Sequence, residues 1–316
     1  MAALPATARA QTTAQATAWP TRPVTLVVPW AAGGGTDTVA RIFAQGLEQT
    51  LGQPINVVNR TGGNGVVGHA AIANATPDGY TIGAGTSEFV NFKALGQSDI
   101  GPGSFDLISH IASIPAGVTV KADAPWADIK AFVAALREGR KGQFTGSGVS
   151  TGGSWHLAAA GMTKSLGMEA DRIRWIPSQG GAPALQDLVA SGITVFTGSP
   201  IEAKALVEAG QVRVLAVMAN ERMSAFPNVP TLKDSGIDWV YENWFSLVAP
   251  RGLPKPIHDK LVELGARAHA LPEVRSQMVA RSIVPVWDGP EAFGTYATQA
   301  AVRSGELLRD LGLARG

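Results

Sequence analysis

The sequence contains no cysteine, and this absence removes several functional classes at once. Disulfides, thiol catalysis and cysteine-ligated metal sites are excluded, whereas oxidising and reducing compartments both stay compatible with the composition. Charged residues make up only 16% of the 316 residues, and the formal net charge is +1. A nearly neutral chain without a basic stripe is a poor partner for nucleic acid or for an anionic membrane surface. We therefore predict that it binds neither.

Other absences narrow the choice further. No apolar run approaches the ~20 residues that a membrane-spanning helix needs. The five histidines are not spaced like metal ligands, and neither a metal nor another cofactor is expected. No motif of the form G-x-x-x-x-G-K-[ST] occurs, which excludes that type of phosphate loop. The 45% of apolar residues still supports a substantial core, in one large α/β domain or two of ordinary size.

Glycine, by contrast, is abundant and concentrated in loops that directly follow short apolar runs. Four such loops lie at 31–37, 61–65, 85–87 and 146–154. Apolar runs and helix-like segments alternate from Val24 onward, which favours parallel strands joined by helices. The carboxyl ends of parallel strands meet at one edge of a sheet, so these loops should form a crevice together. Their free backbone amides and helix N-termini would attract an anion.

The order of the segments predicts two lobes joined by a hinge. The first lobe is expected to comprise residues 19–119 and 245–316, and the second residues 120–244. The first crossing is placed at 118–121, and a return strand at 245–250. A central segment inserted between two halves of another domain is typical of a two-lobed binding protein.

Apolar spacing predicts several helices that support these lobes. One follows the first glycine loop and ends at Gly52, and another carries an apolar face from Ile129 to Leu136. Helices beginning at Pro256 and Pro290 are expected to pack back on the first lobe. The helix that follows the first glycine loop carries Val39, Ile42, Phe43, Leu47 and Leu51 on its inward face.

The N-terminus suggests export. Ala8-Arg9-Ala10 before Gln11 resembles the small-residue end of a secretory signal peptide, and we interpret residues 1–18 as a signal-peptide remnant and flexible leader. The basic start and the apolar centre of a complete signal peptide are missing, so a truncated precursor and an ordinary flexible tail both stay open. Cleavage near Ala10 and Gln11 and a periplasmic location are expected.

Two motifs point to enzymes, and each has a simpler explanation. Gly148–Gly152 matches G-x-S-x-G, which would make Ser150 the nucleophile of a serine hydrolase, with Asp187 and His258 following in hydrolase order. The neighbouring glycines make this loop more permissive than a strained nucleophile elbow requires, and no spacing fixes an Asp–His pair. A glycine and serine turn that binds an anion explains the same residues and is favoured.

The second motif is Gly63–Gly68, which matches the dinucleotide-binding pattern G-x-G-x-x-G, with Glu88 at the end of the next strand. Three residues separate the preceding strand from the first glycine, and the helix that follows is short. These departures from the required strand–turn–helix context make nucleotide binding a weak interpretation.

Side chains beside the glycine loops are candidate ligand contacts. Trp30 would wall the crevice, and Asp37 would reach a ligand donor, although a carboxylate in the first turn of a helix is favoured by the helix dipole in any case. Glu88 either contacts a ligand hydroxyl or faces away. His156 either donates to a ligand oxygen or caps its own loop.

Six segments, spread over the chain, match one family in that family's own order. They are residues 19–23, 28–37, 58–63, 77–81, 180–185 and 226–232, which include Trp19-Pro20-Thr21-Arg22-Pro23, Val58-Asn59-Arg60-Thr61-Gly62-Gly63 and Phe226-Pro227-Asn228-Val229-Pro230-Thr231-Leu232. On these segments the chain resembles the periplasmic solute receptors of tripartite tricarboxylate transporters, the Bug receptor family. The resemblance covers nearly the whole chain from Trp19, and no single motif carries it.

The resemblance implies a type II Venus-flytrap fold of the α/β class, in which each lobe is a mainly parallel sheet flanked by helices. It implies a receptor without catalytic activity that binds a small organic carboxylate between its lobes. Such a receptor is expected to be a monomer and to deliver its ligand to two integral membrane subunits. Among ligands, an aliphatic di- or tricarboxylate is favoured and an aromatic carboxylate comes second.

Carried onto this sequence, the resemblance also implies a set of ligand contacts made by backbone amides and hydroxyl groups. The first lobe would supply Gly34, Gly35, Thr36, Asp37, Thr86 and Ser87, with Trp30 and Glu88 beside them. The second lobe would supply Ser147, Thr151, Gly152, Ser154 and His156, followed by Gln179, Gly180, Gly181 and Ala182 from the next loop. Ser199 and Glu202 are further candidates.

Overall fold

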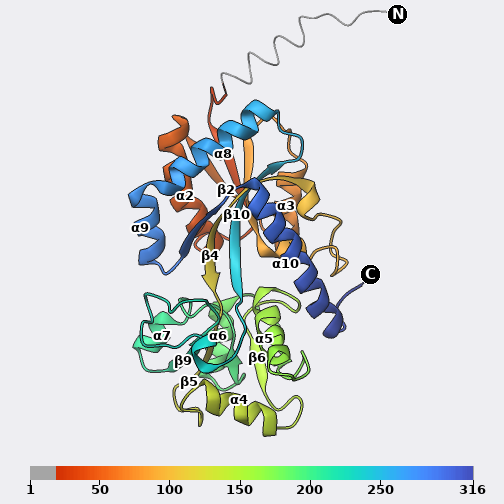
Figure 1. Cartoon of the computed structure of the whole chain (residues 1–316), viewed down its shortest axis with the longest axis vertical. Helices are drawn as coiled ribbons and strands as arrows, with labels where there is room; N and C mark the ends of the chain where they lie inside the picture. Colours follow the sequence, from red (N-terminus) through yellow and green to blue (C-terminus); the bar gives the residue numbers. More distant parts are fainter. Residues whose placement is uncertain (1–18, 316) are drawn as a thin grey trace, which may run out of the picture.

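A computed structural model describes residues 19–315, and the expected leader at 1–18 lies outside the described residues. The chain forms two lobes stacked along the long axis of the molecule (Figure 1). The first lobe has a six-stranded sheet in the order β11-β4-β10-β3-β1-β2. Its strands are β1 (Val24–Val28), β2 (Ile55–Asn59), β3 (Thr81–Thr86), β4 (Phe105–Pro115), β10 (Glu242–Pro250) and β11 (Val284–Asp288). Its helices are α2 (Gly35–Leu51), α3 (Val66–Ala73), α8 (Lys255–Ala270), α9 (Pro272–Ala280) and α10 (Pro290–Asp310), with short 3-10 turns at η1 (Gly63–Gly65), η2 (Ser87–Val90) and η3 (Pro102–Ser104).

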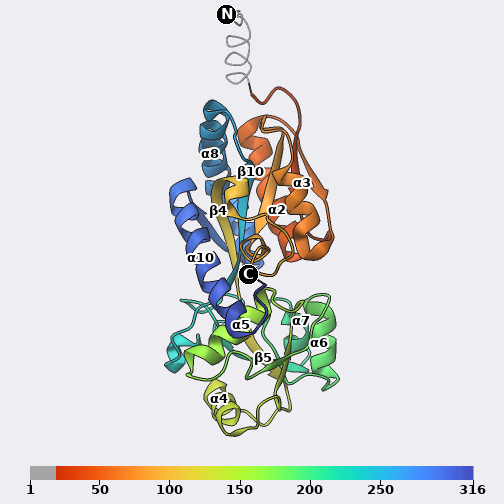
Figure 2. The same cartoon turned by 90° about the vertical axis from the view of Figure 1, so that its right-hand side faces the viewer.

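The second lobe has a five-stranded sheet in the order β7-β6-β8-β5-β9. Its strands are β5 (Gly117–Lys121), β6 (Thr145–Ser147), β7 (Arg174–Trp175), β8 (Val195–Phe196) and β9 (Val212–Val217). Its helices are α4 (Ile129–Glu138), α5 (Ser154–Ser165), α6 (Gly181–Val189) and α7 (Lys204–Glu208), followed by a 3-10 turn at η4 (Lys233–Ser235). A view turned by 90° shows the helices of each lobe lying around the strands (Figure 2).

The expected two-lobed α/β fold is confirmed, but both sheets are mixed and not mainly parallel. In the first lobe β1 pairs in parallel with β2 and β3, but β10 and β11 pair antiparallel with their neighbours. In the second lobe β6 has two parallel partners, whereas β5 pairs antiparallel with β8 and β9. The cause is the hinge: the strands that carry the chain out of a lobe and back into it run in opposite directions and lie side by side.

The chain leaves the first sheet after Pro115 and enters the second at Gly117, a few residues before the crossing expected at 118–121. Ala116 lies between the two strands, and both its backbone amide and its backbone carbonyl form hydrogen bonds. Its amide donates to the Tyr241 carbonyl at 3.0 Å, and its carbonyl accepts from the Met218 amide at 2.8 Å. The Tyr241 amide in turn donates to the Met218 carbonyl at 2.8 Å. Three passes of the chain are therefore tied together by backbone groups at the hinge.

Helical periodicity identified the principal helices correctly. In α2 the expected apolar face from Val39 to Leu51 is buried, and Gly52 ends the helix in a left-handed conformation with φ +68°. In α4 the face from Ile129 to Leu136 is buried, and the Asp128 side chain caps the helix by accepting from the Ala131 amide. The α9 helix and β11 strand were not expected, because a nine-residue helix rich in polar residues gives a weak apolar period.

The α10 helix links the lobes a second time. It covers the first sheet, but its last turns reach α5 of the second lobe, where Leu307 and Leu308 pack with Leu157 and Ala160 (Figure 1). The loops that follow β2 and β6 also meet, since the Ser150 hydroxyl donates to the Asn64 side-chain oxygen at 2.9 Å. The two lobes are thus in contact both behind and in front of the hinge strands.

Packing around Gly161 of α5 leaves no room for a side chain, because a Cβ there would lie 1.9 Å from Trp239 Cζ2. We expect Gly161→Ala to lower the free energy of unfolding by roughly 1–3 kcal/mol, the usual cost of overpacking. Gly305 of α10 is the matched control, because a Cβ there meets no atom within 4 Å. Gly305→Ala should raise stability by about 0.5–1 kcal/mol through helix propensity. Urea unfolding of both variants measures the difference, and equal stabilities would contradict this packing.

Candidate ligand-binding site

The site lies between the lobes, at a cavity of about 260 Å³. Its lining residues come from α2, β4, the loop after β8, and the turn between α9 and β11: Gly35, Thr38, Ile114, Ser199, Ile201, Glu202, Arg281 and Ile283. Three of these, Gly35, Ser199 and Glu202, were predicted from the sequence. Arg281 was not, because no motif marks it and its position depends on the unexpected α9–β11 turn.

Three helices begin at glycines near the space between the lobes. Gly34, Gly153 and Gly180 are the N-caps of α2, α5 and α6, and no side chain caps any of these helices. The first amides of a helix have no partner inside it, and they carry the positive end of the helix dipole. A ligand oxygen with negative charge is therefore favoured at each end.

Asp37 shapes its loop, since both of its carboxylate oxygens are engaged within the protein. One oxygen accepts from the Gly33 amide at 2.8 Å and from Arg41 Nε at 2.9 Å, and the other accepts from Asn59 Nδ2 at 2.9 Å. Burial alone would raise the pKa of Asp37, but these three partners together outweigh it and lower the pKa. The carboxylate has no oxygen left without a protein partner, so its role is to fix the glycine loop beside α2.

Trp30 and Thr86 are held by a buried histidine relay. The Trp30 indole donates to Thr86 Oγ1 at 3.2 Å, and the Thr86 amide donates to His69 Nε2 at 3.2 Å. Because Nε2 accepts, the ring proton lies on Nδ1, which donates to the Gly65 carbonyl at 2.8 Å. Burial lowers the pKa of His69 to about 4, so the ring stays neutral. This relay orients the end of β3.

Ser87 and Glu88 are buried beside the second lobe. The Ser87 hydroxyl donates to the Asn243 side-chain oxygen. Burial raises the pKa of Glu88, and the nearby side chains of Thr86, Ser154 and Ser87 oppose this shift. Its Oε2 atom has no partner among the described residues. Glu88 therefore faces Ser154 across the gap between the lobes.

In the second lobe, His156 caps its own loop. Its Nδ1 accepts from the Gly152 amide at 3.0 Å, and its ring stacks on Trp175 with centroids 4.7 Å apart. Burial lowers the pKa of His156 to about 4. The amide of Gly152 and the accepting nitrogen of His156 are thus used within the loop. Thr151 is exposed beside them, and the buried Ser147 hydroxyl has no partner among the described residues.

The next loop leads into α6. Gln179 and Ala182 are exposed, and Gly180 and Gly181 form the start of the helix. The Glu202 carboxyl group lies against Gly181, since a Cβ there would be 2.1 Å from Glu202 Oε2.

Ser150 is not part of a hydrolase triad. Its hydroxyl donates to Asn64, and its expected partners Asp187 and His258 lie elsewhere. Asp187 is exposed on α6, and His258 lies on α8, at the end of the first lobe far from the second (Figure 1). The ring of His258 instead faces Asp259, 3.4 Å away.

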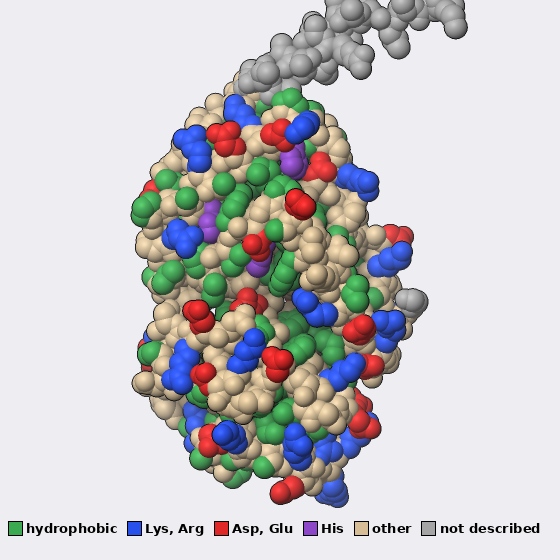
Figure 3. Space-filling model, viewed as in Figure 1, with side chains coloured by type: hydrophobic (Ala, Val, Ile, Leu, Met, Phe, Trp, Pro, Cys, Tyr) green, Lys and Arg blue, Asp and Glu red, His purple; other side chains and the backbone are tan. Residues whose placement is uncertain are grey.

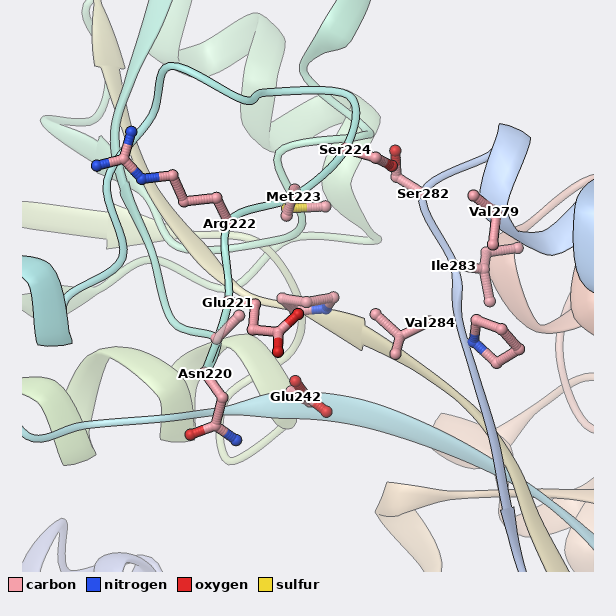
Figure 4. Close-up of a pocket in the computed structure, with 13 residues that line it drawn as sticks. Asn220, Glu221, Arg222, Met223, Ser224, Glu242, Val279, Ser282, Ile283 and Val284 are labelled. Atoms are coloured by element: carbon pink, nitrogen blue, oxygen red, sulfur yellow. The ribbon is translucent and has the colours of Figure 1, made fainter.

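A larger cavity of about 500 Å³ lies beside the hinge strands, and no residue predicted from the sequence lines it. Figure 3 shows hydrophobic side chains in the hollow between the lobes on the face that carries β10. In Figure 4, Glu221 and Glu242 lie on one side of this larger cavity, and Ile283 and Val284 on the other. The larger cavity is lined by these two carboxylates and by Arg222, which already pairs with Asp234, whereas the smaller cavity sets Arg281 against the single carboxylate of Glu202. The smaller cavity, with Arg281 and the start of α2, is the better anion site despite its size.

Two mixed α/β lobes joined by crossing strands, with polar loops facing one another across the gap, define a two-lobed solute-binding protein. The family model of the tripartite tricarboxylate transporter family receptor, TctC, matches residues 39–313. The chain belongs to this family of periplasmic receptors.

Individual relatives agree with the family. The chain is 31% identical to a UPF0065 protein of Agrobacterium vitis, over 85% of this chain and 77% of the relative. It is 27% identical to the protein BugT of Bordetella pertussis, over 97% of this chain and 94% of the relative. A solved TctC solute-binding protein from Polaromonas is 32% identical, with a TM-score of 0.77 over 92% of this chain and 99% of that chain.

Two further solved structures hold ligands. MatC from Rhodopseudomonas palustris with bound malate is 26% identical, with a TM-score of 0.77 over 92% of this chain and all of that chain. The protein Rpa4515 of the same organism with adipate is 29% identical, with a TM-score of 0.79 over 94% of this chain and 99% of that chain.

The family settles two earlier questions. Its members are binding receptors and not enzymes, so the serine-hydrolase interpretation of Ser150 is wrong. The Bug-family resemblance is confirmed. Within residues 19–315, no helix has the length and apolar character that crossing a membrane requires.

The bonds of Asp37 lead to a prediction about stability and pH. We expect Asp37→Ala to cost roughly 2–3 kcal/mol at pH 7, the scale of lost hydrogen bonds to a charged group. Because the pKa of Asp37 is lowered by folding, its contribution is present above the unfolded value of about 3.9 and is lost as the pH falls through the lower folded value. The difference between parent and variant should therefore narrow below about pH 4. Chemical unfolding across pH measures this, with the exposed Asp99→Ala as control.

Proposed function

We propose that this chain captures a small organic carboxylate between its lobes and delivers it to the two membrane subunits of a tripartite tricarboxylate transporter. The observation that carries the proposal is that α2 of the first lobe and α5 and α6 of the second begin at glycines without a side-chain cap, and that Gly35 of α2 lines a cavity together with Ser199 and Glu202 of the second lobe. Amide donors aimed at one place favour a charged oxygen, and they need no buried arginine to do so.

The ligands of related proteins support a carboxylate. The solved structures with malate and with adipate each hold an aliphatic dicarboxylate, and both share this fold at 26% and 29% identity. We therefore place aliphatic di- and tricarboxylates first and aromatic carboxylates second. We further propose that the protein works as an exported periplasmic monomer.

Within the gap, we assign the carboxylate anchor to Gly34, Gly35, Thr36, Thr151, Ser154 and the loop from Gln179 to Ala182. Trp30, Asp37, Gly152 and His156 hold these loops in place through the bonds described above. Arg281 extends the anchor, because its guanidinium lines the same cavity and makes no ion pair within 4 Å among residues 19–315. Its one hydrogen bond goes to the Gln277 carbonyl at 3.1 Å. A second ligand carboxylate would therefore find a cation there.

If Thr151 bonds the anchored carboxylate, Thr151→Ala should weaken binding by roughly 1–2 kcal/mol, about tenfold. The melting temperature of the ligand-free protein should stay unchanged, because this hydroxyl is exposed. Titration calorimetry against malate, adipate, citrate and benzoate, on protein stripped of ligand by unfolding and refolding, measures the effect. Thr298→Ala on α10 is the control. The proposal does not survive if the parent protein binds none of these acids.

Arg281 is tested by comparing acids with one and two carboxylates. We expect Arg281→Gln to weaken adipate by about tenfold or more while leaving hexanoate within about twofold, since only the dicarboxylate reaches the guanidinium. Arg275→Gln, an exposed position on α9, should affect neither acid. An equal loss for both acids would instead mean that Arg281 only shapes the cavity.

A further inference from the structure

Glu202 is the one acidic side chain among the residues that line the smaller cavity, of about 260 Å³. It follows Ser199 and Pro200 in the loop after β8, and its amide donates to the Ser199 carbonyl at 3.1 Å. The carboxyl group lies against Gly181 at the start of α6, opposite Gly35 and Thr38 of the first lobe. It therefore stands inside the space where the ligand is proposed to bind.

This carboxyl group has no partner. No hydrogen bond or ion pair joins it to another side chain among residues 19–315, although eleven other Asp and Glu residues of that part of the chain take part in ion pairs. The side chain keeps an exposed surface toward the gap, yet protein surrounds the carboxyl group closely enough that burial raises its pKa to about 7. An acceptor that is exposed to the gap and has no partner among the described residues is free to accept a hydrogen bond from a bound molecule.

Its charged neighbours are few and mostly engaged. On α2, Asp37 and Arg41 pair with each other. On α7, Lys204 pairs with Glu208. The turn between α9 and β11 contributes Arg281, which lines the same cavity. The remaining lining residues, from β4 and the loop after β8, are neutral. The cavity thus offers amides and one guanidinium to ligand carboxylates, and one carboxylate that accepts hydrogen bonds.

We propose that Glu202 accepts a hydrogen bond from a ligand hydroxyl, so that the receptor selects hydroxylated di- or tricarboxylates over otherwise identical acids that lack the hydroxyl. The inference rests on the proposed function, since carboxylate groups must first be held by the amides and Arg281. An ionised carboxylate can only accept, and a hydroxyl is the smallest neutral donor that an organic acid carries. A cavity of about 260 Å³ is at the small end for ligand sites, which suits an acid of few carbons.

The selection should depend on pH. Above about pH 7 Glu202 is ionised. The carboxylate then accepts a strong hydrogen bond from a ligand hydroxyl, and it repels a ligand carboxylate that comes close. Below that pH the protonated carboxyl group both donates and accepts, so a hydroxyl brings less advantage. The preference for the hydroxylated acid is therefore expected to fall as the pH is lowered through about 7.

Two pairs of probes differ only by a hydroxyl group: malate with succinate, and citrate with tricarballylate. At pH 8.5 we expect the parent protein to bind the hydroxylated member of at least one pair about tenfold more tightly or better, measured by titration calorimetry. At pH 5.5 the ratio should shrink. Glu202→Met, which removes the acceptor at similar size, should bring the ratio close to one. Glu202→Gln, which cannot ionise, should make the ratio independent of pH.

Glu208→Gln is the matched control, because Glu208 is exposed on α7 and outside the cavity, and it should behave like the parent. Thermal unfolding of each variant confirms that it is folded. The inference is overturned if the parent binds both members of each pair equally at pH 8.5, or if Glu202→Met keeps the preference. In either case carboxylate binding itself still stands. Absence of binding by all four acids, with the wider panel also negative, would reject the proposed function instead.

Discussion

Every part of the site depends on the backbone node at Ala116. Its amide and carbonyl are both used, and they join the outgoing chain to Tyr241, just before β10, and to Met218, just after β9. Because these hydrogen bonds join main-chain groups, they do not depend on which side chains the three residues carry. The node sets the distance between the two sheets, and with it the distance between the glycine loops of one lobe and those of the other.

This arrangement explains how a weakly charged chain can favour an anion. Each lobe contributes uncapped helix N-termini, whose partial charges act only over short range. These partial charges attract one anion jointly only when the lobes hold the helix N-termini close to each other. Asp37 and His156, two of the predicted ligand contacts, accept hydrogen bonds from backbone amides of their own loops. At the proposed site, affinity for an anion would therefore come from the placement of these amides more than from the net charge.

The sequence predicted the features that neighbouring residues determine, and it missed those that depend on contacts between distant segments. The apolar periods of α2 and α4 and the glycine loops after strands were read correctly, since helix faces and turns are determined by neighbouring residues. The antiparallel pairs of both sheets were missed, because they join segments that lie far apart in the sequence, such as β4 and β10. Arg281 was missed for the same reason: it lies on a turn that joins the cavity only through tertiary packing.

The end of α10 bears on the rate at which the lobes open, and not on how tightly a ligand is bound. Two adjacent strand crossings alone would leave the lobes free to swing about a single axis. The contact of Leu307 and Leu308 with α5, together with the ion pair between Lys164 and Asp310, fastens the lobes at a point away from that axis. Wide opening then requires this small apolar clasp to separate first. The residence time of a captured molecule would accordingly be governed by how often the last turns of one helix detach.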